Sequence, residues 1–581
     1  MSALRLDLIR RHLRPHRRPL ILGALALVVV NLLGVAIPRL VERVVDELKP
    51  GFSLQQVMGQ ALLLLLLASV MGAIRLSSRM LVFGVGRQVE ADLKQRIFDH
   101  LLGQEPGWVQ SMGSGEVISR TTSDVEQVRR LMGFAVLSLT NTVLAYALTL
   151  PAMLRIDPWL SLTALSLYPV MLLVVRLFGG RMMRQQRRQQ EALASLSDLV
   201  QEDLSGIGAI KIYGQESTER QAFAQRNRAY RDTALHLART RSSLFPLLEG
   251  ISSLSLLVLL ALGAGQIEAE RLSIGGLVAL ILYVERLVFP TALLGFTLNT
   301  FQTGQVSLER VEQLLERRPL IVSPAQPLSP ALQPRGAVEA RGLTVRYPQA
   351  SRPALHDLRF RLEPGELVAV VGPVGCGKTT LARALGRMVE VPAGQLYLDG
   401  VDITAMALDD LRRQVALVPQ EGYLFTASLA DNLRYGRPEA TMERVEDAAR
   451  AARLEGDIRG FPDGFATLVG ERGITLSGGQ RQRTALGRAL LMEAPLLVLD
   501  DALASVDNTT AAGILRTIRG QGERSVLMIS HQLSAAAACD RVLVLEAGRL
   551  VQQGHHSELV RQEGTYRRLW EREEFQRLQA A

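Results

Sequence analysis

The chain has 581 residues, of which 48% are apolar and 21% are charged. This length exceeds one domain and suits two or three, and the mixture predicts a lipid-soluble part joined to a water-soluble part. Two cysteines exclude a disulfide framework and suit domains that face a reducing compartment. The formal charge of +9 is compatible with nucleic-acid binding, but the arginines cluster beside apolar runs, which favours a membrane protein without nucleic acid.

The N-terminus joins a basic segment to an uncharged run, Pro19–Pro38. This run is too long for a signal peptide and lacks a small-residue cleavage site. About 20 helical residues, rising about 1.5 Å each, cross the hydrocarbon core of a bilayer. We therefore expect a membrane-spanning helix whose N-terminus lies inside the cell. The basic residues are Arg5, Arg10, Arg11, Arg14, Arg17 and Arg18.

Further apolar runs of similar length follow, and with the first they predict six spans. Lysine and arginine are concentrated in the long connections 75–130 and 176–249, which places these connections in the cytoplasm and returns the C-terminal half to the same side. Both connections are helical in character, so we expect helices that project well beyond the membrane. The further runs are Val57–Ile74, Leu131–Leu154, Pro158–Val175, Gly250–Ile267 and Leu272 to about Asn299.

Two charged residues, Glu285 and Arg286, lie about halfway along the sixth run. Charged side chains inside a membrane usually face a cavity or a partner. Adjacent residues of a helix do not face each other, so these two cannot simply pair. Lining of a cavity and an interhelical structural contact both remain open.

The sequence changes character after the sixth span. Ser307–Arg318 predicts an amphipathic helix, and Pro319–Pro334 predicts a proline-rich linker. Short β-branched runs then alternate with helical stretches, which predicts a mostly parallel sheet covered by helices. These runs are Leu367–Val371, Val415–Val418, Leu496–Leu499, Val526–Ile529 and Val542–Leu545.

The predicted fold class is a multi-domain membrane protein: an all-α six-helix transmembrane domain followed by an α/β nucleotide-binding domain. The expected boundaries are a basic N-terminal elbow at 1–18, the transmembrane domain at 19–304, a linker at 305–335 and the α/β domain at 336–581.

A glycine-rich phosphate-binding loop directly follows the strand Leu367–Val371. Its glycines allow successive backbone N–H groups to face phosphate oxygens, and the start of the next helix, at Thr380, adds a partial positive charge. Lys378 is expected to reach the outer phosphates of ATP, and the Thr379 hydroxyl to bind Mg²⁺. The thiol of Cys376 is expected to react with maleimides and to be protected by ATP. The loop is Gly372-Pro373-Val374-Gly375-Cys376-Gly377-Lys378-Thr379.

A second strand, Leu496–Leu499, ends in two acidic residues, Asp500 and Asp501. Paired carboxylates at the end of a covered strand indicate that a cation binds there. Asp500 suits a water-mediated contact with Mg²⁺. Asp501 is suited to orient the attacking water, because phosphoryl transfer depends on positioning and charge stabilisation.

A further glycine-rich segment, Leu476-Ser477-Gly478-Gly479-Gln480, opens another helix. It resembles the signature sequence of the ATP-binding cassette family. The resemblance extends to Thr467–Gly473, and to Gly86–Leu102, Ser114–Arg130 and Lys211–Glu216, which are similar to the cytoplasmic extensions and coupling helices of six-helix exporters.

The resemblance implies roles for four more residues. Tyr347 would stack on adenine, and Gln420 would touch Mg²⁺ and water and contact the membrane domain. Asp507 would belong to the aspartate loop, and His531 would be the switch histidine. The implied activity is ATP hydrolysis coupled to transport.

Asp501 departs from the family pattern, which has glutamate at this position. Its carboxylate lies about 1 Å further back, and a misplacement of this size can cost about 10²-fold in rate. Among exporters an aspartate here resembles the weak half of a heterodimer, so a second half-transporter carrying the glutamate is implied.

The resemblance leaves the cargo and the partner open. The first hypothesis is an exporter of amphipathic compounds in the bacterial plasma membrane, with membrane lipids around it. The alternatives are a regulatory half that binds ATP but scarcely hydrolyses it, and a homodimeric lipid flippase.

Overall fold

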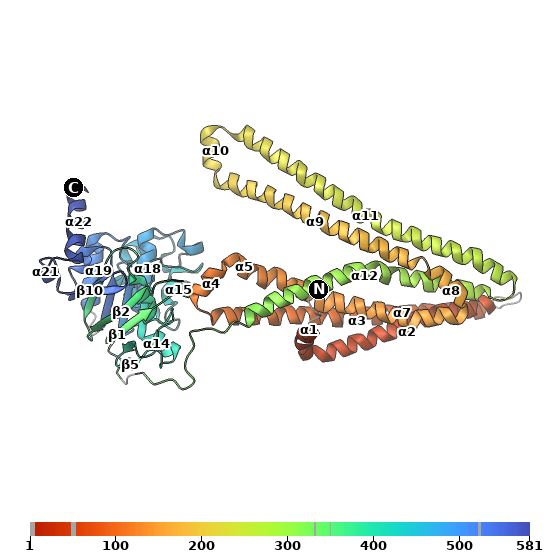
Figure 1. Ribbon diagram of the computed structural model, residues 1–581, viewed down its shortest axis with the longest axis horizontal. Helices are drawn as coiled ribbons and strands as arrows, with labels where there is room; N and C mark the ends of the chain where they lie inside the picture. Colours follow the sequence, from red (N-terminus) through yellow and green to blue (C-terminus); the bar gives the residue numbers. More distant parts are fainter. Residues whose placement is uncertain (1–5, 48–53, 331–332, 349, 521–523, 581) are drawn as a thin grey trace. The chain divides into compact units, whose positions relative to one another are not determined.

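The computed structural model describes residues 6–47, 54–330, 333–348, 350–520 and 524–580 (Figure 1). Arg5, residues 48–53 of the first connection and residues 331–332 of the linker lie outside this part. The chain forms two compact units, Met1–Leu102 with Gly113–Arg317, and Gly103–Met112 with Arg318–Ala581. The expected domain boundaries at residues 18, 304 and 335 remain predictions.

The first unit is entirely helical in its described part, and six of its helical segments are long and apolar enough to cross a membrane. The six-span prediction is thereby confirmed. The helices are α1 (Leu6–Leu13), α2 (Arg17–Glu47), α3 (Leu54–Leu102), α5 (Ser114–Ser119), α6 (Val125–Arg130), α7 (Val136–Ile156), α8 (Pro158–Leu165), α9 (Tyr168–Ser205), α10 (Ile207–Tyr213), α11 (Glu216–Glu268) and α12 (Ile274–Leu315). Short 3₁₀ or π-helical turns occupy Arg14–His16, Arg120–Asp124 and Leu131–Ala135.

Three of these helices, α3, α9 and α11, run far beyond their apolar parts, as the polar connections predicted. Figure 1 shows α9 and α11 side by side with α10 joining their ends. Helix α12 is continuous to Leu315, so the amphipathic segment expected from Ser307 is the last part of α12. Helix α12 can continue through this segment because no glycine or proline stands between Ser307 and Leu315.

Polar contacts fasten the ends of these helices to one another. Asp124 accepts a hydrogen bond from Ser307 at 2.8 Å and pairs with Arg310 at 3.2 Å. His12 and Glu312 are both buried and lie 2.8 Å apart, which attaches the N-terminal helix α1 to α12. Buried polar side chains with such partners specify how the helices pack, because an unpaired one would be costly.

The two charged residues in the middle of α12 have different surroundings. Arg286 donates to the side-chain oxygen of Asn31 at 3.0 Å and to its backbone oxygen at 3.2 Å. A Cβ added at Gly34 would come within 1.2 Å of the Arg286 guanidinium, so glycine makes room for it on α2. Arg286 therefore makes an interhelical contact, whereas Glu285 is exposed on the isolated chain.

The second unit contains a four-stranded sheet in the order β2-β1-β4-β5 and a six-stranded sheet in the order β10-β9-β3-β8-β7-β6. In the larger sheet, β9, β3, β8, β7 and β6 are parallel, and β10 pairs antiparallel with β9. The strands are β1 (Val338–Val345), β2 (Leu355–Leu362), β3 (Leu367–Val371), β4 (Leu396–Leu398), β5 (Val401–Asp402), β6 (Val415–Val418), β7 (Leu496–Asp500), β8 (Ser525–Ile529), β9 (Arg541–Glu546) and β10 (Arg549–Gly554).

Strands β3, β7 and β8 are buried along their whole length, which explains their continuous apolar sequences. Helices cover the larger sheet and complete its core. They are α13 (Lys378–Leu385), α14 (Leu408–Gln414), α15 (Leu429–Arg434), α16 (Met442–Ala451), α17 (Glu455–Gly460), α18 (Gly478–Leu491), α19 (Asn508–Gly520), α20 (Leu533–Ala536), α21 (His556–Leu559) and α22 (Thr565–Ala580), and α4 (Pro106–Met112) groups with this unit.

The described part of the proline-rich linker lies on the second unit. Leu328 forms a bridge with Met406 and donates its backbone N–H to Ala405 at 2.8 Å. Ser323 accepts from the backbone N–H of Leu408 at 3.0 Å. This part of the linker is thus held by hydrogen bonds of its backbone and of the Ser323 side chain, although it forms no regular helix or strand.

Candidate ATP site

Four motif segments meet at one edge of the larger sheet. Strands β3, β8, β7 and β6 are adjacent and parallel, so their carboxyl ends lie together. The phosphate loop follows β3, His531 follows β8, Asp501 follows β7 and Gln420 follows β6. Ligands of open parallel sheets bind at this edge.

The loop Gly372–Thr379 has the backbone that the glycines predicted. Gly375 and Gly377 adopt positive φ angles of 80° and 103°. A Cβ at Gly377 would approach the carbonyl oxygen of Ala354 at 2.5 Å, so only glycine fits there. Helix α13 begins at Lys378, and its free N–H groups and partial positive charge therefore belong to the same loop.

The side chain of Lys378 is hydrogen-bonded to the backbone of its own loop. Its Nζ donates to the carbonyl oxygens of Gly372 at 2.8 Å and Pro373 at 3.0 Å, and the residue is 6% exposed. The loop therefore holds a buried ammonium group beside a helix N-terminus. This combination suits a polyphosphate.

Asp500 and Thr379 lie together between β7 and α13. The Thr379 hydroxyl donates to Asp500 Oδ1 at 3.2 Å. Burial raises the pKa of the Asp500 carboxyl, the bond from Thr379 opposes this, and the neighbouring Asp501 carboxylate raises the pKa further. A desolvated carboxylate beside a hydroxyl and a second carboxylate can hold a hard cation.

Asp501 turns away from the strand in a left-handed conformation with φ of 52°. Its backbone N–H donates to Ile529 at 3.0 Å, and its Oδ1 accepts from the backbone N–H of His531 at 3.4 Å. Aspartate tolerates positive φ better than most residues with a Cβ. Asp501 and His531 are thus brought together at the ends of adjacent strands.

Tyr347 lies beside the phosphate loop. Its hydroxyl is 3.3 Å from the Thr380 hydroxyl in the first turn of α13. The tyrosine follows β1, so it comes from the smaller sheet. Within the loop, the side chain of Val374 is 90% exposed.

The signature segment caps helix α18. Ser477 accepts from the backbone N–H of Gln480, and Gln480 accepts from the backbone N–H of Ser477 at 2.9 Å, which forms a capping box. Ser477 and Gly478 are exposed. In the described part of this unit, no hydrogen bond, ion pair or ring contact joins Ser477–Gln480 to the loop Gly372–Thr379.

Comparisons with known proteins cover both units. Residues 20–291 match the family model of the ABC transporter transmembrane region, and residues 355–504 match the family model described as ABC transporter. The chain belongs to the ABC exporter family. It is an ATPase-coupled exporter and a multi-pass integral membrane protein.

Full-length relatives share this organisation. The chain is 32% identical over 567 residues to the multidrug resistance-like ATP-binding protein MdlA of Escherichia coli, covering 96% of this chain and 95% of that protein. It is 29% identical to a probable multidrug resistance ABC transporter protein, YheI, of Bacillus subtilis, covering 94% of each. The solved structure of a bacterial Atm1-family ABC exporter with ATP bound has a TM-score of 0.78 and 26% identity, covering 96% of this chain and 99% of that chain.

One sequence expectation for this exporter is wrong. The thiol of Cys376 is not displayed by the loop, because the residue is 4% exposed and packs in the core beneath it. Lys378 Nζ lies 3.7 Å from its sulfur. Cys376 therefore contributes its backbone to the loop and its side chain to the core. Cys539 is also buried, and this burial raises the pKa of its thiol to about 12.

Asp507 occupies the turn before α19. Its Oδ1 accepts from the backbone N–H of Thr510 at 2.9 Å and from the Thr509 hydroxyl. These hydrogen bonds hold the pKa of the exposed Asp507 carboxyl well below its usual range. The residue fixes the start of α19, and the preceding turn carries Ser505 next to the signature: a Cβ on Gly479 would lie 2.9 Å from the Ser505 carbonyl oxygen.

Sequence reasoning missed Gln482, which connects three of these segments. It lies on α18, donates to the backbone oxygen of Gln420 at 3.4 Å and accepts from the backbone N–H of Ser505 at 2.9 Å. The available signal was a second glutamine two residues after the signature, but the sequence alone could not reveal its burial or its partners. Gln420 itself is exposed.

Glu573 was also missed. It lies on the C-terminal helix α22 and accepts from the backbone N–H of Leu533 at 2.7 Å, at the start of α20 and two residues after His531. Helix α22 is anchored by the buried Tyr566, whose hydroxyl bonds His556 at 2.8 Å. A carboxylate at a helix N-terminus satisfies a free N–H group there.

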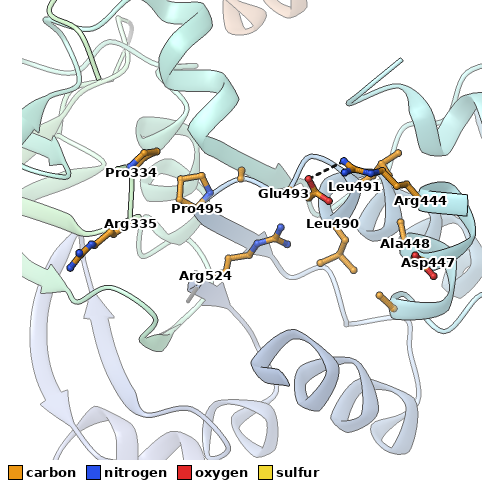
Figure 2. Close-up of a pocket in the computed structure, with 12 residues that line it drawn as sticks. Pro334, Arg335, Arg444, Asp447, Ala448, Leu490, Leu491, Glu493, Pro495 and Arg524 are labelled. Carbon is orange, nitrogen blue, oxygen red and sulfur yellow. Dashed lines mark hydrogen bonds and ion pairs between the residues drawn. The ribbon is translucent and has the colours of Figure 1, made fainter. Parts of the chain in front are cut away.

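A cavity of about 580 Å³ opens at the opposite edge of the sheet (Figure 2). Pro495, just before β7, and Arg524, just before β8, line it. Figure 2 shows Glu493 paired with Arg444, at 3.3 Å, and Glu493 also binds Arg437 at 2.6 Å. Because the motif residues gather at the carboxyl ends of the strands, this cavity is separate from the candidate ATP site.

Replacing Lys378 with alanine should abolish ATP-dependent transport and weaken ATP binding, because the loop loses its buried ammonium group. Binding of a fluorescent ATP analogue to the purified exporter measures the effect. Unchanged affinity in Lys378→Ala would contradict the assignment of the loop.

Both cysteines should resist maleimide in the native exporter, with or without MgATP, and both should react after denaturation. Mass spectrometry should count no adducts in the native chain and two in the unfolded chain. Rapid native labelling of Cys376 would show that its loop opens far more than the structure indicates.

Replacing Glu573 with alanine should reduce ATP turnover about 2- to 10-fold, because the segment after His531 loses its cap. Glu573→Gln keeps an acceptor oxygen and should restore most of the activity. The matched control is Glu574→Ala, which removes the same charge from an exposed neighbour. Equal turnover in all three variants would exclude a positioning role for Glu573.

Proposed function

We propose that this chain is one half of a dimeric exporter that moves amphipathic compounds out of the bacterial cytoplasm. The observation that carries the proposal is that the phosphate loop and the signature segment lie apart in one chain. The phosphate loop, Asp500, Asp501 and His531 gather at one sheet edge, whereas the exposed signature starts a separate helix that, among the described residues, makes no hydrogen bond or ion pair to that loop. Two chains together supply both parts to each ATP.

Within this proposal, the backbone of Gly372–Thr380 and the Lys378 ammonium group bind the phosphates of ATP, and the ring of Tyr347 stacks on adenine. Ser477–Gln480 of one half approaches the phosphate loop of the other half, and Asp507 belongs to the same interface. ABC exporters work as dimers, which supports this arrangement. The N-terminus and the ATPase domain then face the cytoplasm.

The residues at the carboxyl edge also fit Mg²⁺. The Thr379 hydroxyl and the buried Asp500 carboxylate lie 3.2 Å apart, and Gln420 follows the end of the neighbouring strand β6. Hard oxygen ligands of this kind suit Mg²⁺, which supplies charge neutralisation for the phosphates. Asp501 orients the attacking water, and His531 holds the outer phosphate in place.

ATP acts as a ligand that favours the paired, outward-facing state, because only that state supplies both halves of the site. Hydrolysis removes this preference. The family resemblance gives Gln420 a contact with the membrane domain, and the backbone of Gln420 is held by Gln482 of the signature helix.

The cargo class is supported by the relatives, whose names describe multidrug resistance or multidrug export. A heterodimer is favoured by Asp501, which stands where the family has glutamate. The burial of Asp501 and its contact with His531 leave the shorter side chain little freedom to reach further. The alternatives are a regulatory half with little hydrolysis of its own and a homodimeric lipid flippase.

Substitutions at Asp501 distinguish these possibilities. Asp501→Glu should raise turnover at this chain's site by about 10-fold, because the carboxylate reaches the water. Asp501→Asn should change the ATP turnover of the complex little if the partner supplies the glutamate. Steady-state ATPase assays on the purified complex, with its subunits identified by mass spectrometry, measure both.

One result would contradict the heterodimer. A complex that contains this chain alone, hydrolyses ATP rapidly in step with transport and is silenced by Asp501→Asn would show that aspartate suffices and that no second gene product is needed.

A further inference from the structure

An unpaired carboxylate lies in the middle of the sixth membrane span. Glu285 is 11 residues after the start of α12, or about 17 Å along the helix axis. The hydrocarbon core of a bilayer is about 30 Å thick, so this position lies near its middle. Its side chain is exposed on the isolated chain. No hydrogen bond or ion pair links it to another residue in the described part of the first unit.

The neighbouring Arg286 does not neutralise it directly. Its guanidinium is directed at α2, where it binds Asn31 and lies over Gly34. Successive helical residues are about 100° apart around the axis, so Glu285 belongs to a different face of α12.

Large aromatic residues share the face of Glu285. Phe289 and Phe296 follow it by 4 and 11 residues, which places them within about 40° of it around the helix. They are 57% and 56% exposed. The ring of Phe296 also packs edge-on against Phe134, with centroids 5.4 Å apart. Phe134 lies in the helical turn Leu131–Ala135 that precedes α7, so the aromatic surface extends toward that turn.

This face is unsuited to lipid. A carboxylate at mid-depth facing acyl chains is costly, and intramembrane acids usually face a cavity or a polar partner. Aromatic faces and a carboxylate together match a ligand that is apolar and positively charged, through cation–π attraction and charge pairing.

We propose that Glu285, Phe289 and Phe296 form part of the translocation pathway and recognise the positive charge of amphipathic cations. This inference rests on the proposed export function and specifies its substrate class. Glu285 supplies the charge preference, and the phenylalanines supply apolar and aromatic contact that does not depend on the sign of the charge.

Two ions of the same shape test the charge preference: tetraphenylphosphonium, a permanent cation, and tetraphenylborate, a permanent anion. The full exporter is purified with its natural partner and reconstituted into liposomes. ATP turnover and ATP-dependent transport are followed against the concentration of each ion. Wild type should respond at a lower concentration of the cation than of the anion.

Glu285→Gln should raise the half-maximal concentration for the cation about tenfold relative to that for the anion, because only the cation loses a charge partner. Glu285→Asp should keep most of the preference for the cation over the anion. Phe289→Ala should weaken the response to both ions. The matched control is Glu268→Gln, which removes an exposed carboxylate at the end of α11 and should preserve the wild-type preference.

The response to the anion shows that each variant is folded and coupled. A wild-type preference for the anion, or an unchanged preference in Glu285→Gln, would overturn this inference while leaving the export function intact. A wild-type exporter whose turnover and transport respond to neither ion contradicts both the inference and the proposed export of amphipathic compounds.

Discussion

The alignment of adjacent parallel strand ends is the constraint on which the ATP site depends. Ile529 of β8 is level with Val370 of β3 and with Asp500 of β7, so three strands end together. The backbone N–H of Asp501 bonds Ile529, and that of Ser530 bonds Val370. A one-residue slip of β7 would exchange its two faces and carry Asp500 away from Thr379. The site therefore follows from sheet register as much as from its own residues.

The signature helix extends this constraint to the rest of the ATPase unit. Gln482 ties α18 to the segments at Gln420 and Ser505, and Arg483 pairs with Asp457 at 2.9 Å. Helix α18, whose start is exposed, is thus hydrogen-bonded to the segment that follows β6. These hydrogen bonds join the signature helix to two segments beside the ATP site, the one that follows β6 and the one that precedes α19.

Much of this arrangement was predictable from the sequence, because the informative patterns are local. The six spans depend on apolar length, and the phosphate loop depends on glycines between a strand and a helix. Contacts between distant segments were not predictable: the cap that Glu573 provides near His531, and the burial of Cys376 beneath its loop. The adjacent charged residues of α12 show the limit most clearly, since only the positions of α2 and Gly34 reveal that Arg286 packs against α2 while Glu285 is exposed on the isolated chain.

The division of the site between two chains is tested most directly by a structure of the purified, reconstituted exporter trapped with MgATP. The phosphates should contact Gly372–Thr379 of this chain and the serine and glycines of the signature of a second chain, with Ser477–Gln480 facing the nucleotide of that second chain. ATP held by one chain alone, or by the loop and signature of the same chain, would contradict the dimeric mechanism.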